Sequence, residues 1–209
     1  MLKFWGRMSS INVKKVVWAA QELGLAFERT DAGLHFGLTK TPGYLGMNPN
    51  ALVPVMDDGG FLLWESNVIV RYLCAKHSFG NLYPQDLQQR FNAERWMDWQ
   101  QTAINPAGRD AFIQWVRTPL ELRHNDLIAR SLSATAPKLA MLDRHLAQTA
   151  FMAGGQFSMA DIPLGCEIQR WWGLPHEHSP RTAYPAIERW YALLKARPAS
   201  SGVLDLPLS

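Results

Sequence analysis

Hydrophobic and polar positions divide this 209-residue chain into two parts of different architecture. In the first part, short runs rich in β-branched and aromatic residues predict strands at residues 2–5, 26–30, 52–56 and 61–64. Apolar positions at helical spacing predict one helix between the first two strands and another after the fourth. The order β-α-β followed by β-β-α predicts one small sheet with helices packed on it.

The second part shows helical spacing and no strand pattern. Helices are predicted over residues 86–115, 120–146 and 183–195, with another that starts near residue 158. Prolines at positions 106 and 137 fall inside the first two helices and predict a bend or a break.

Residues 76–85 contain glycine, asparagine and proline and predict a linker. The expected fold class is therefore α/β followed by all-α. We expect a thioredoxin-like domain over residues 1–77 and an all-helical domain over residues 86–201. In the helical domain, Ser158 and Asp161 have the spacing of a capping box, although Pro163 removes one early helical hydrogen bond.

The segment from Val53 to Ser66 predicts a binding site for a short peptide. Pro54 falls inside the expected third strand and cannot donate a ladder hydrogen bond, which predicts an edge or a bulge and allows a cis bond after Val53. At such an edge, the N–H and C=O of Val53 would face outward and pair with an extended peptide. Glu65 and Ser66 add a carboxylate, a hydroxyl and free N–H groups at a helix start, which suit a charged peptide end.

In this order and at this spacing, Val53-Pro54 and Glu65-Ser66 resemble the glutathione-binding half of a cytosolic glutathione S-transferase, and the resemblance covers essentially the whole chain. It implies a cis proline at Pro54, a Val53 backbone that pairs with the cysteinyl unit, and a γ-glutamyl group held by Glu65 and Ser66. It also implies a homodimer, with glutathione as co-substrate and no metal or other cofactor.

The loop before the first helix is where members of the family carry the residue that activates the thiol. A helix N-terminus favours negative charge, and a thiol with a pKa of about 8.5 is mostly protonated at neutral pH. This loop has no tyrosine or cysteine, and Trp5 ends the strand where tyrosine-type classes carry theirs. Ser10-Ile11-Asn12 resembles the loop of bacterial serine/threonine-type members, theta-like or nu-like, which implies Ser10 as thiol donor and Asn12 as a second donor. Alternatively, Ser9, Ser10 or Asn12 only caps the helix.

The resemblance gives roles to five further residues, each of which has a simpler alternative. Lys40 falls where members often bind the glycyl carboxylate, or it is a solvated loop lysine. Arg109, Phe112 and Trp115 share one helix face, which would line an electrophile pocket or pack against other helices. Glu94 falls where some members reach into the partner subunit's site, or it is a surface charge.

Composition and charge exclude several other classes. A net charge of +3 without a long run of lysine and arginine argues against a nucleic-acid partner. No apolar run reaches membrane-spanning length and the N-terminus has no signal pattern, so no membrane partner is expected. The only two cysteines, Cys74 and Cys166, are expected to be inert core thiols, which indicates a reducing compartment, the cytoplasm.

The sequence thus predicts a glutathione transferase that conjugates the glutathione thiolate to a small hydrophobic electrophile. Two alternatives remain: glutathione-dependent disulfide reduction or isomerisation at the same site, and a non-catalytic interaction module with this fold. Because a pure binding module has no need of Ser10, Val53-Pro54 and Glu65-Ser66, their presence favours an enzyme.

Overall fold

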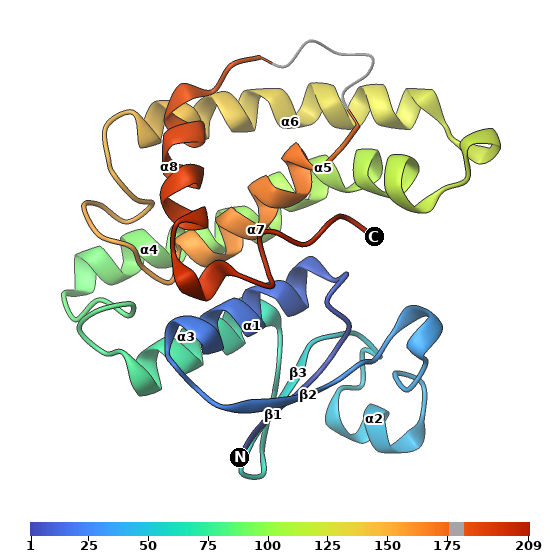
Figure 1. Ribbon diagram of the computed structural model, residues 1–209, viewed down its shortest axis with the longest axis vertical. Helices are drawn as coiled ribbons and strands as arrows, with labels where there is room; N and C mark the ends of the chain where they lie inside the picture. Colours follow the sequence, from blue (N-terminus) through green and yellow to red (C-terminus); the bar gives the residue numbers. More distant parts are fainter. Residues whose placement is uncertain (176–181) are drawn as a thin grey trace. The chain divides into compact units, whose positions relative to one another are not determined.

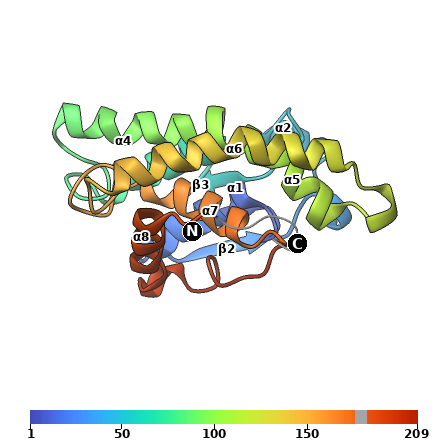
Figure 2. The ribbon, with the colours of Figure 1, turned by 90° about the horizontal axis from the view of Figure 1, so that it is seen from above.

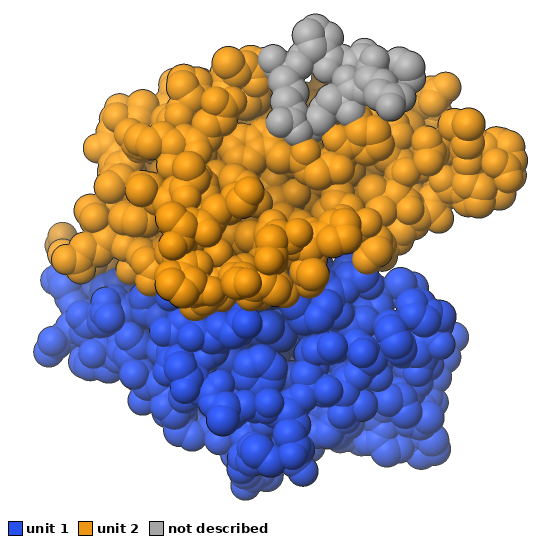
Figure 3. Space-filling view, in the orientation of Figure 1, with its two compact units in different colours: residues 1–86 blue, residues 87–209 orange. Residues whose placement is uncertain are grey.

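The computed structural model describes residues 1–175 and 182–209 (Figure 1). They form two compact units, Met1–Asp86 and Leu87–Ser209, coloured separately in Figure 3. Residues 78–85, expected to be part of a linker, belong to the first unit. There the Ser78 hydroxyl accepts a hydrogen bond from the N–H of Leu82 and the Ser78 carbonyl accepts one from Tyr83, both at 3.2 Å.

The first unit is built on a four-stranded sheet in the order β2-β1-β3-β4. Its strands are β1 (Leu2–Trp5), β2 (Phe27–Thr30), β3 (Val55–Asp58) and β4 (Phe61–Trp64). β1 and β2 are parallel, whereas β3 is antiparallel to both of its neighbours, β1 and β4. This is the predicted thioredoxin-like topology, and the fold class is confirmed.

The prediction that Pro54 lies at an edge or a bulge within a strand over residues 52–56 was wrong. β3 begins at Val55 and lies between β1 and β4, so it is an interior strand. Pro54 precedes the first ladder residue, where its missing N–H costs no strand hydrogen bond. Val53 therefore lies just beyond the end of the sheet.

Three helices complete the first unit: α1 (Ile11–Glu22), α2 (Pro42–Met47) and α3 (Ser66–His77). α1 and α3 contact each other and cover one face of the sheet, while α2 lies beside it (Figure 1). Apolar side chains from the sheet and from both covering helices are buried: Phe4, Val13, Val17, Met56, Ile69 and Leu73. Burial of these side chains holds the strand ends, and the loops attached to them, in fixed positions.

The second unit consists of helices α4 (Leu87–Trp99), α5 (Asn105–Phe112), α6 (Asn125–Leu146), α7 (Asp161–Trp172) and α8 (Pro185–Lys195). α5 and α6 pack side by side (Figures 1 and 2). The described part of this unit contains no strand, only an isolated bridge between Phe151 and Gly154. None of the helices that the structure describes is both long enough and apolar enough to span a membrane.

The break predicted at Asn105-Pro106 is replaced by a π-helical segment, Gln100–Ile104, which joins α4 to α5 without a gap. A second π-helical segment, Ile113–Arg117, follows α5. A π-helical turn is wider than an α-helical one, so the chain continues where the proline would otherwise clash with the preceding turn. Pro137 lies inside α6 and does not split it.

A buried carboxylate, Asp161, organises the start of α7. Its oxygens accept hydrogen bonds from the N–H groups of Met152 (2.9 Å) and Ser158 (2.8 Å), from the Ser158 hydroxyl (3.2 Å) and from the Trp190 indole (2.8 Å). Asp161 thus reaches back to the Ser158 N–H as predicted, but the prediction that Ser158 caps the helix was wrong, because Ala160 precedes α7 and no side chain caps its first turn. Pro163 is the third residue of α7, where its missing N–H is not needed by the helix. Burial raises the pKa of Asp161 to about 6.

Candidate functional site at the edge of the sheet

The strand directions bring four segments of the first unit to one edge of the sheet. β1, β2 and β4 end at this edge and β3 begins there, because Trp5 pairs with Thr30 and Val55, and Val55 pairs with Trp64. Neighbouring strands lie about 4.8 Å apart. Across the edge, in the order β4, β3, β1, β2, the attached segments are Glu65-Ser66, Val53-Pro54, Arg7 to Ser10, and Ala32-Gly33.

Val53 presents its main chain at this edge. The Val53–Pro54 peptide bond is cis, and neither the N–H nor the C=O of Val53 is hydrogen-bonded to any residue that the structure describes. The preceding carbonyl, of Leu52, accepts hydrogen bonds from the Tyr44 hydroxyl (2.7 Å) and the Asn48 side-chain amide (2.9 Å). In a trans peptide the C=O and the following N–H point in opposite directions, so fixing the Leu52 carbonyl turns the Val53 N–H away from Tyr44.

Tyr44 and Asn48, which the sequence analysis did not single out, thus hold the segment before Val53. Tyr44 is buried on α2, and burial raises the pKa of its hydroxyl to about 12, so it remains a donor at neutral pH. The Asn48 carboxamide oxygen accepts hydrogen bonds from the backbone (3.0 Å) and side chain (3.1 Å) of Asn50. The Asn48-Pro49-Asn50 run indicates a turn, but its residue types do not indicate which carbonyl it holds.

Glu65 and Ser66 lie at the start of α3. Glu65 is exposed and has φ +73°, an uncommon conformation for a residue with a side chain, which costs on the order of 1–3 kcal/mol. Its carbonyl accepts the first helical bond, from Ile69, so the N–H groups of residues 66–68 have no acceptor within the helix. Ser66 is buried as the first helical residue. A strained residue beside N–H groups that the helix itself does not use is an arrangement suited to binding a charged group.

Ser10 is the N-cap residue of α1. Its carbonyl accepts hydrogen bonds from Val13 and Lys14, both at 3.0 Å, but its hydroxyl makes no capping bond. The alternative in which the Ser10 side chain serves as the helix cap was therefore wrong. Asn12 is the second residue of α1 and is partly buried. The edge thus combines a helix N-terminus with a hydroxyl that α1 does not use.

Two basic residues differ in how the first unit holds them. Lys40 lies exposed between the short helix Leu34–Phe36 and α2. The Arg7 guanidinium, which the sequence analysis did not select, lies over Gly33: a Cβ atom at Gly33 would be 2.7 Å from Nη1 of Arg7. Gly33 has φ +83°, so glycine suits both this backbone conformation and the close approach.

The predicted residues of the second unit do not share one environment. Phe112 is buried in a cluster with Ala111 and Leu174, against which Trp115 also packs. Arg109 is exposed on α5. Packing between helices therefore accounts for Phe112 and Trp115, whereas Arg109 remains accessible.

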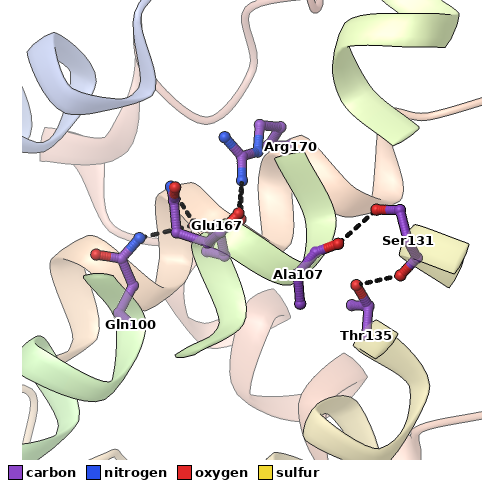
Figure 4. A network of polar contacts seen from close by, with 7 residues as sticks. Gln100, Ala107, Ser131, Thr135, Glu167 and Arg170 are labelled. Carbon is purple, nitrogen blue, oxygen red and sulfur yellow. Dashed lines mark hydrogen bonds and ion pairs between the residues drawn. The ribbon is translucent and has the colours of Figure 1, made fainter. Parts of the chain in front are cut away.

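A buried polar network lies beside this cluster (Figure 4). Glu167 forms an ion pair with Arg170 and accepts hydrogen bonds from the side-chain amides of Gln100 (2.7 Å) and Asn105 (3.0 Å). The Arg170 guanidinium lies 5.3 Å from the centre of the Phe112 ring. Because Glu167 has three partners, the network is best read as a structural link between α7 and the π-helical segment. No group of three or more metal-binding side chains occurs in the part of the chain that the structure describes.

Comparisons with known proteins match the same family in both parts of the chain. Family models for the glutathione S-transferase N-terminal domain and C-terminal domain match residues 1–75 and 125–193. The chain is 37% identical to glutathione S-transferase GstB of Escherichia coli (strain K12), and 100% of each chain is covered. It is 27% identical to the probable glutathione S-transferase GSTF2 of Oryza sativa subsp. japonica, covering 98% of this chain and 96% of the relative.

A solved structure is also similar over the full length. It is the theta class glutathione S-transferase of Xanthomonas axonopodis pv. citri with glutathione bound. The TM-score is 0.95 and the identity 41%, with 100% of this chain and 99% of that chain covered.

Proposed function

The chain belongs to the glutathione S-transferase family, and from this we propose that it binds glutathione at the sheet edge of its first unit and transfers the thiolate to a small electrophile. The observation that carries this proposal is the Ser10 hydroxyl, which lies at the N-terminus of α1 and makes no capping bond. It stands at the same sheet edge as the unpaired main chain of Val53.

Glutathione is held at two points in this proposal. The N–H and C=O of Val53 pair with the cysteinyl unit, as two neighbouring strands would. The γ-glutamyl group lies at the start of α3, where the Ser66 hydroxyl and the first-turn N–H groups bind its carboxylate and Glu65 binds its ammonium. At the glycyl end, Lys40 is the predicted basic residue, and its exposed amine adds a loop charge rather than a fixed contact.

Catalysis then depends on the thiolate. Ser10 donates a hydrogen bond to the sulfur, with Asn12 as a second donor, and the N-terminus of α1 adds a favourable field. The thiol proton leaves to solvent, and each pKa unit by which the site lowers the thiol corresponds to about 1.4 kcal/mol. The sulfur electron pair forms the new bond to the electrophile, whose leaving group departs with the electrons of the broken bond.

We place the electrophile against the second unit, at Arg109 and Phe112 of α5 and Trp115 of the π-helical segment that follows it. The exposure of Arg109 supports it as the residue that contacts the electrophile, while Phe112 and Trp115 form the packed wall behind it. Disulfide exchange through a protein thiol has less support. The loop between β1 and α1 has no cysteine, and burial raises the pKa of Cys74 to about 12.

We further propose a homodimer in the cytoplasm. Phe61, Leu62 and Trp64 on β4 and Val68 on α3 are large exposed apolar side chains, an arrangement that monomers rarely leave uncovered. Glu94 would reach the partner's site only in such a dimer. Both cysteines are buried thiols, in keeping with a reducing compartment.

The test is the thiolate absorbance of the enzyme–glutathione complex as a function of pH. Because a hydrogen bond to a charged group contributes about 1.5–3 kcal/mol, Ser10→Ala should raise the bound thiol's pKa by about one to two units. The rate at neutral pH should fall accordingly and partly recover in alkaline buffer, while glutathione affinity changes less. Ser9→Ala is the matched control and Asn12→Ala tests the second donor. A titration unchanged by Ser10→Ala would remove Ser10 from the mechanism.

A further inference from the structure

Arg7, which has no role in the site as proposed, is a charged group that the fold leaves without a counterpart. Its guanidinium makes no hydrogen bond or ion pair with any residue that the structure describes, and its Nε atom is buried without a partner. Burial lowers the pKa of this guanidinium. Asp31, the acidic residue that follows β2, pairs with Arg29 instead, and Arg29 also donates to the Gly6 carbonyl (2.7 Å). A partly buried cation without an acceptor is costly, and a bound anion would offset that cost.

The sheet order determines which part of glutathione can reach Arg7. Along the edge, Glu65 and Ser66 follow β4, Val53 precedes β3 and Arg7 follows β1, so Val53 lies between the other two. A peptide whose middle pairs with Val53 and whose first residue lies at Ser66 must extend its last residue toward β1 and β2. The segments that follow β4 and β1 are two strand spacings apart, about 10 Å, which is the length of an extended tripeptide.

The Arg7 guanidinium lies over Gly33, in the loop that follows β2. A Cβ atom at Gly33 would be 2.7 Å from Nη1 of Arg7 and 3.6 Å from Cγ1 of Val53, so the guanidinium lies against the loop that follows β2, close to Val53. The charged group on the last residue of glutathione is the glycyl carboxylate. A planar guanidinium can donate two parallel hydrogen bonds to a carboxylate.

We propose that Arg7 binds the glycyl carboxylate of glutathione and is the main residue that distinguishes glutathione from analogues lacking that charge. The inference rests on the proposed function, since it concerns the same bound peptide. Lys40, the residue predicted for this role, is exposed in a loop and must lose side-chain freedom on binding, whereas packing over Gly33 already restricts Arg7.

The experiment compares two ligands, glutathione and its glycyl monoethyl ester, by calorimetry on the full chain. The ester keeps the γ-glutamyl group and the thiol but has no glycyl charge. Wild-type protein should bind glutathione at least tenfold more tightly than the ester. Arg7→Gln should lower glutathione affinity by about tenfold to a hundredfold and leave ester affinity within about threefold of wild type. Retained ester binding also shows that the variant is folded.

Lys40→Gln removes the neighbouring loop charge and should keep most of the wild-type preference for glutathione over the ester. A preference that Lys40→Gln abolishes and Arg7→Gln preserves would overturn the inference. Equal affinity of wild type for the two ligands would overturn it too, while leaving the proposed function intact. If wild-type protein binds neither ligand, the proposed function itself fails, and the inference fails with it.

Discussion

At the scale of single residues, the proposed site depends on main-chain groups whose directions are fixed by side chains outside it. The Leu52 carbonyl has two donors, Tyr44 and Asn48, and their hydrogen bonds set the direction of the Val53 N–H. Neither donor is placed to touch glutathione in this proposal. They are positioning residues, and their substitution should affect glutathione binding more than the chemical step.

Tyr44→Phe provides a test of this positioning role. Loss of one hydrogen bond, worth about 1 kcal/mol, should weaken glutathione binding about fivefold and leave the rate at saturating glutathione nearly unchanged. Tyr72→Phe is the matched control, because its hydroxyl donates to Asp58 (2.7 Å) at the opposite end of β3. Steady-state kinetics with glutathione as the varied substrate separates the two effects. Equal losses in both variants would indicate a general effect on the fold instead.

At the scale of elements, the predicted bounds match the structure where neighbouring residues determine where an element begins and ends. They differ where contacts with residues far along the chain determine this. The strands Leu2–Trp5 and Phe61–Trp64 have their predicted bounds, because turn residues follow the first and precede the second. The helix through Pro106 was predicted to bend or break. It continues because a π-helical segment joins α4 to α5, next to amides bound by Glu167, more than 60 positions later in the chain. The contact with Glu167 cannot be predicted from the residues around Pro106.

The candidate site also contains some residues that a short sequence motif predicts and one that depends on distant contacts. Val53, Pro54, Glu65 and Ser66 could be predicted because each belongs to a short motif with a fixed place relative to a strand or helix. The burial of Arg7 over a glycine in another loop depends on how β1 and β2 pair, and this spatial relation has no sequence motif.

The start of α7 yields a prediction about pH. Four donors stabilise the Asp161 carboxylate, but burial outweighs them and raises its pKa to about 6 from a usual value near 3.8. A raised pKa in the folded state means that the contribution to stability is fully present below the unfolded-state pKa and is lost as the pH rises through about 6. The shift of about two units corresponds to roughly 3 kcal/mol.

Denaturant unfolding of wild type and Asp161→Asn between pH 4 and pH 7 measures this contribution, because the variant cannot titrate at that position. The stability of wild type relative to the variant should decrease across this range. A difference that instead grows with pH would mean that the four hydrogen bonds, and not burial, determine which form the folded protein prefers.

At the scale of the whole molecule, the exposed apolar surface of β4 and α3 bears on assembly. β4 is an edge strand of the sheet, and edge strands with apolar side chains readily join another chain. The surface defined by Phe61, Leu62, Trp64 and Val68 is therefore the part of the first unit that we expect a second copy to cover.

Leu62→Lys should shift the proposed dimer toward monomer, because a lysine ammonium would have to be buried in the proposed interface. Leu120→Lys is the matched control, since Leu120 is a more exposed leucine (76% against 40%) in the second unit. Sedimentation equilibrium over a range of protein concentrations gives the dissociation constant of each variant. If Leu120→Lys dissociates the dimer and Leu62→Lys does not, the interface lies elsewhere.

The unpaired main chain of Val53 also affects how natural variation in this protein can be interpreted. The atoms proposed to hold the cysteinyl unit belong to every amino acid with a backbone N–H, so substitution at position 53 changes the packing of the side chain against Ala32, Tyr44 and Val55 but does not remove them. A mutational scan would then report the packing of this side chain and not the contribution of the main chain. Replacing the amide at this position by an ester, which deletes the N–H and keeps the valine side chain, is the change that would reveal its contribution.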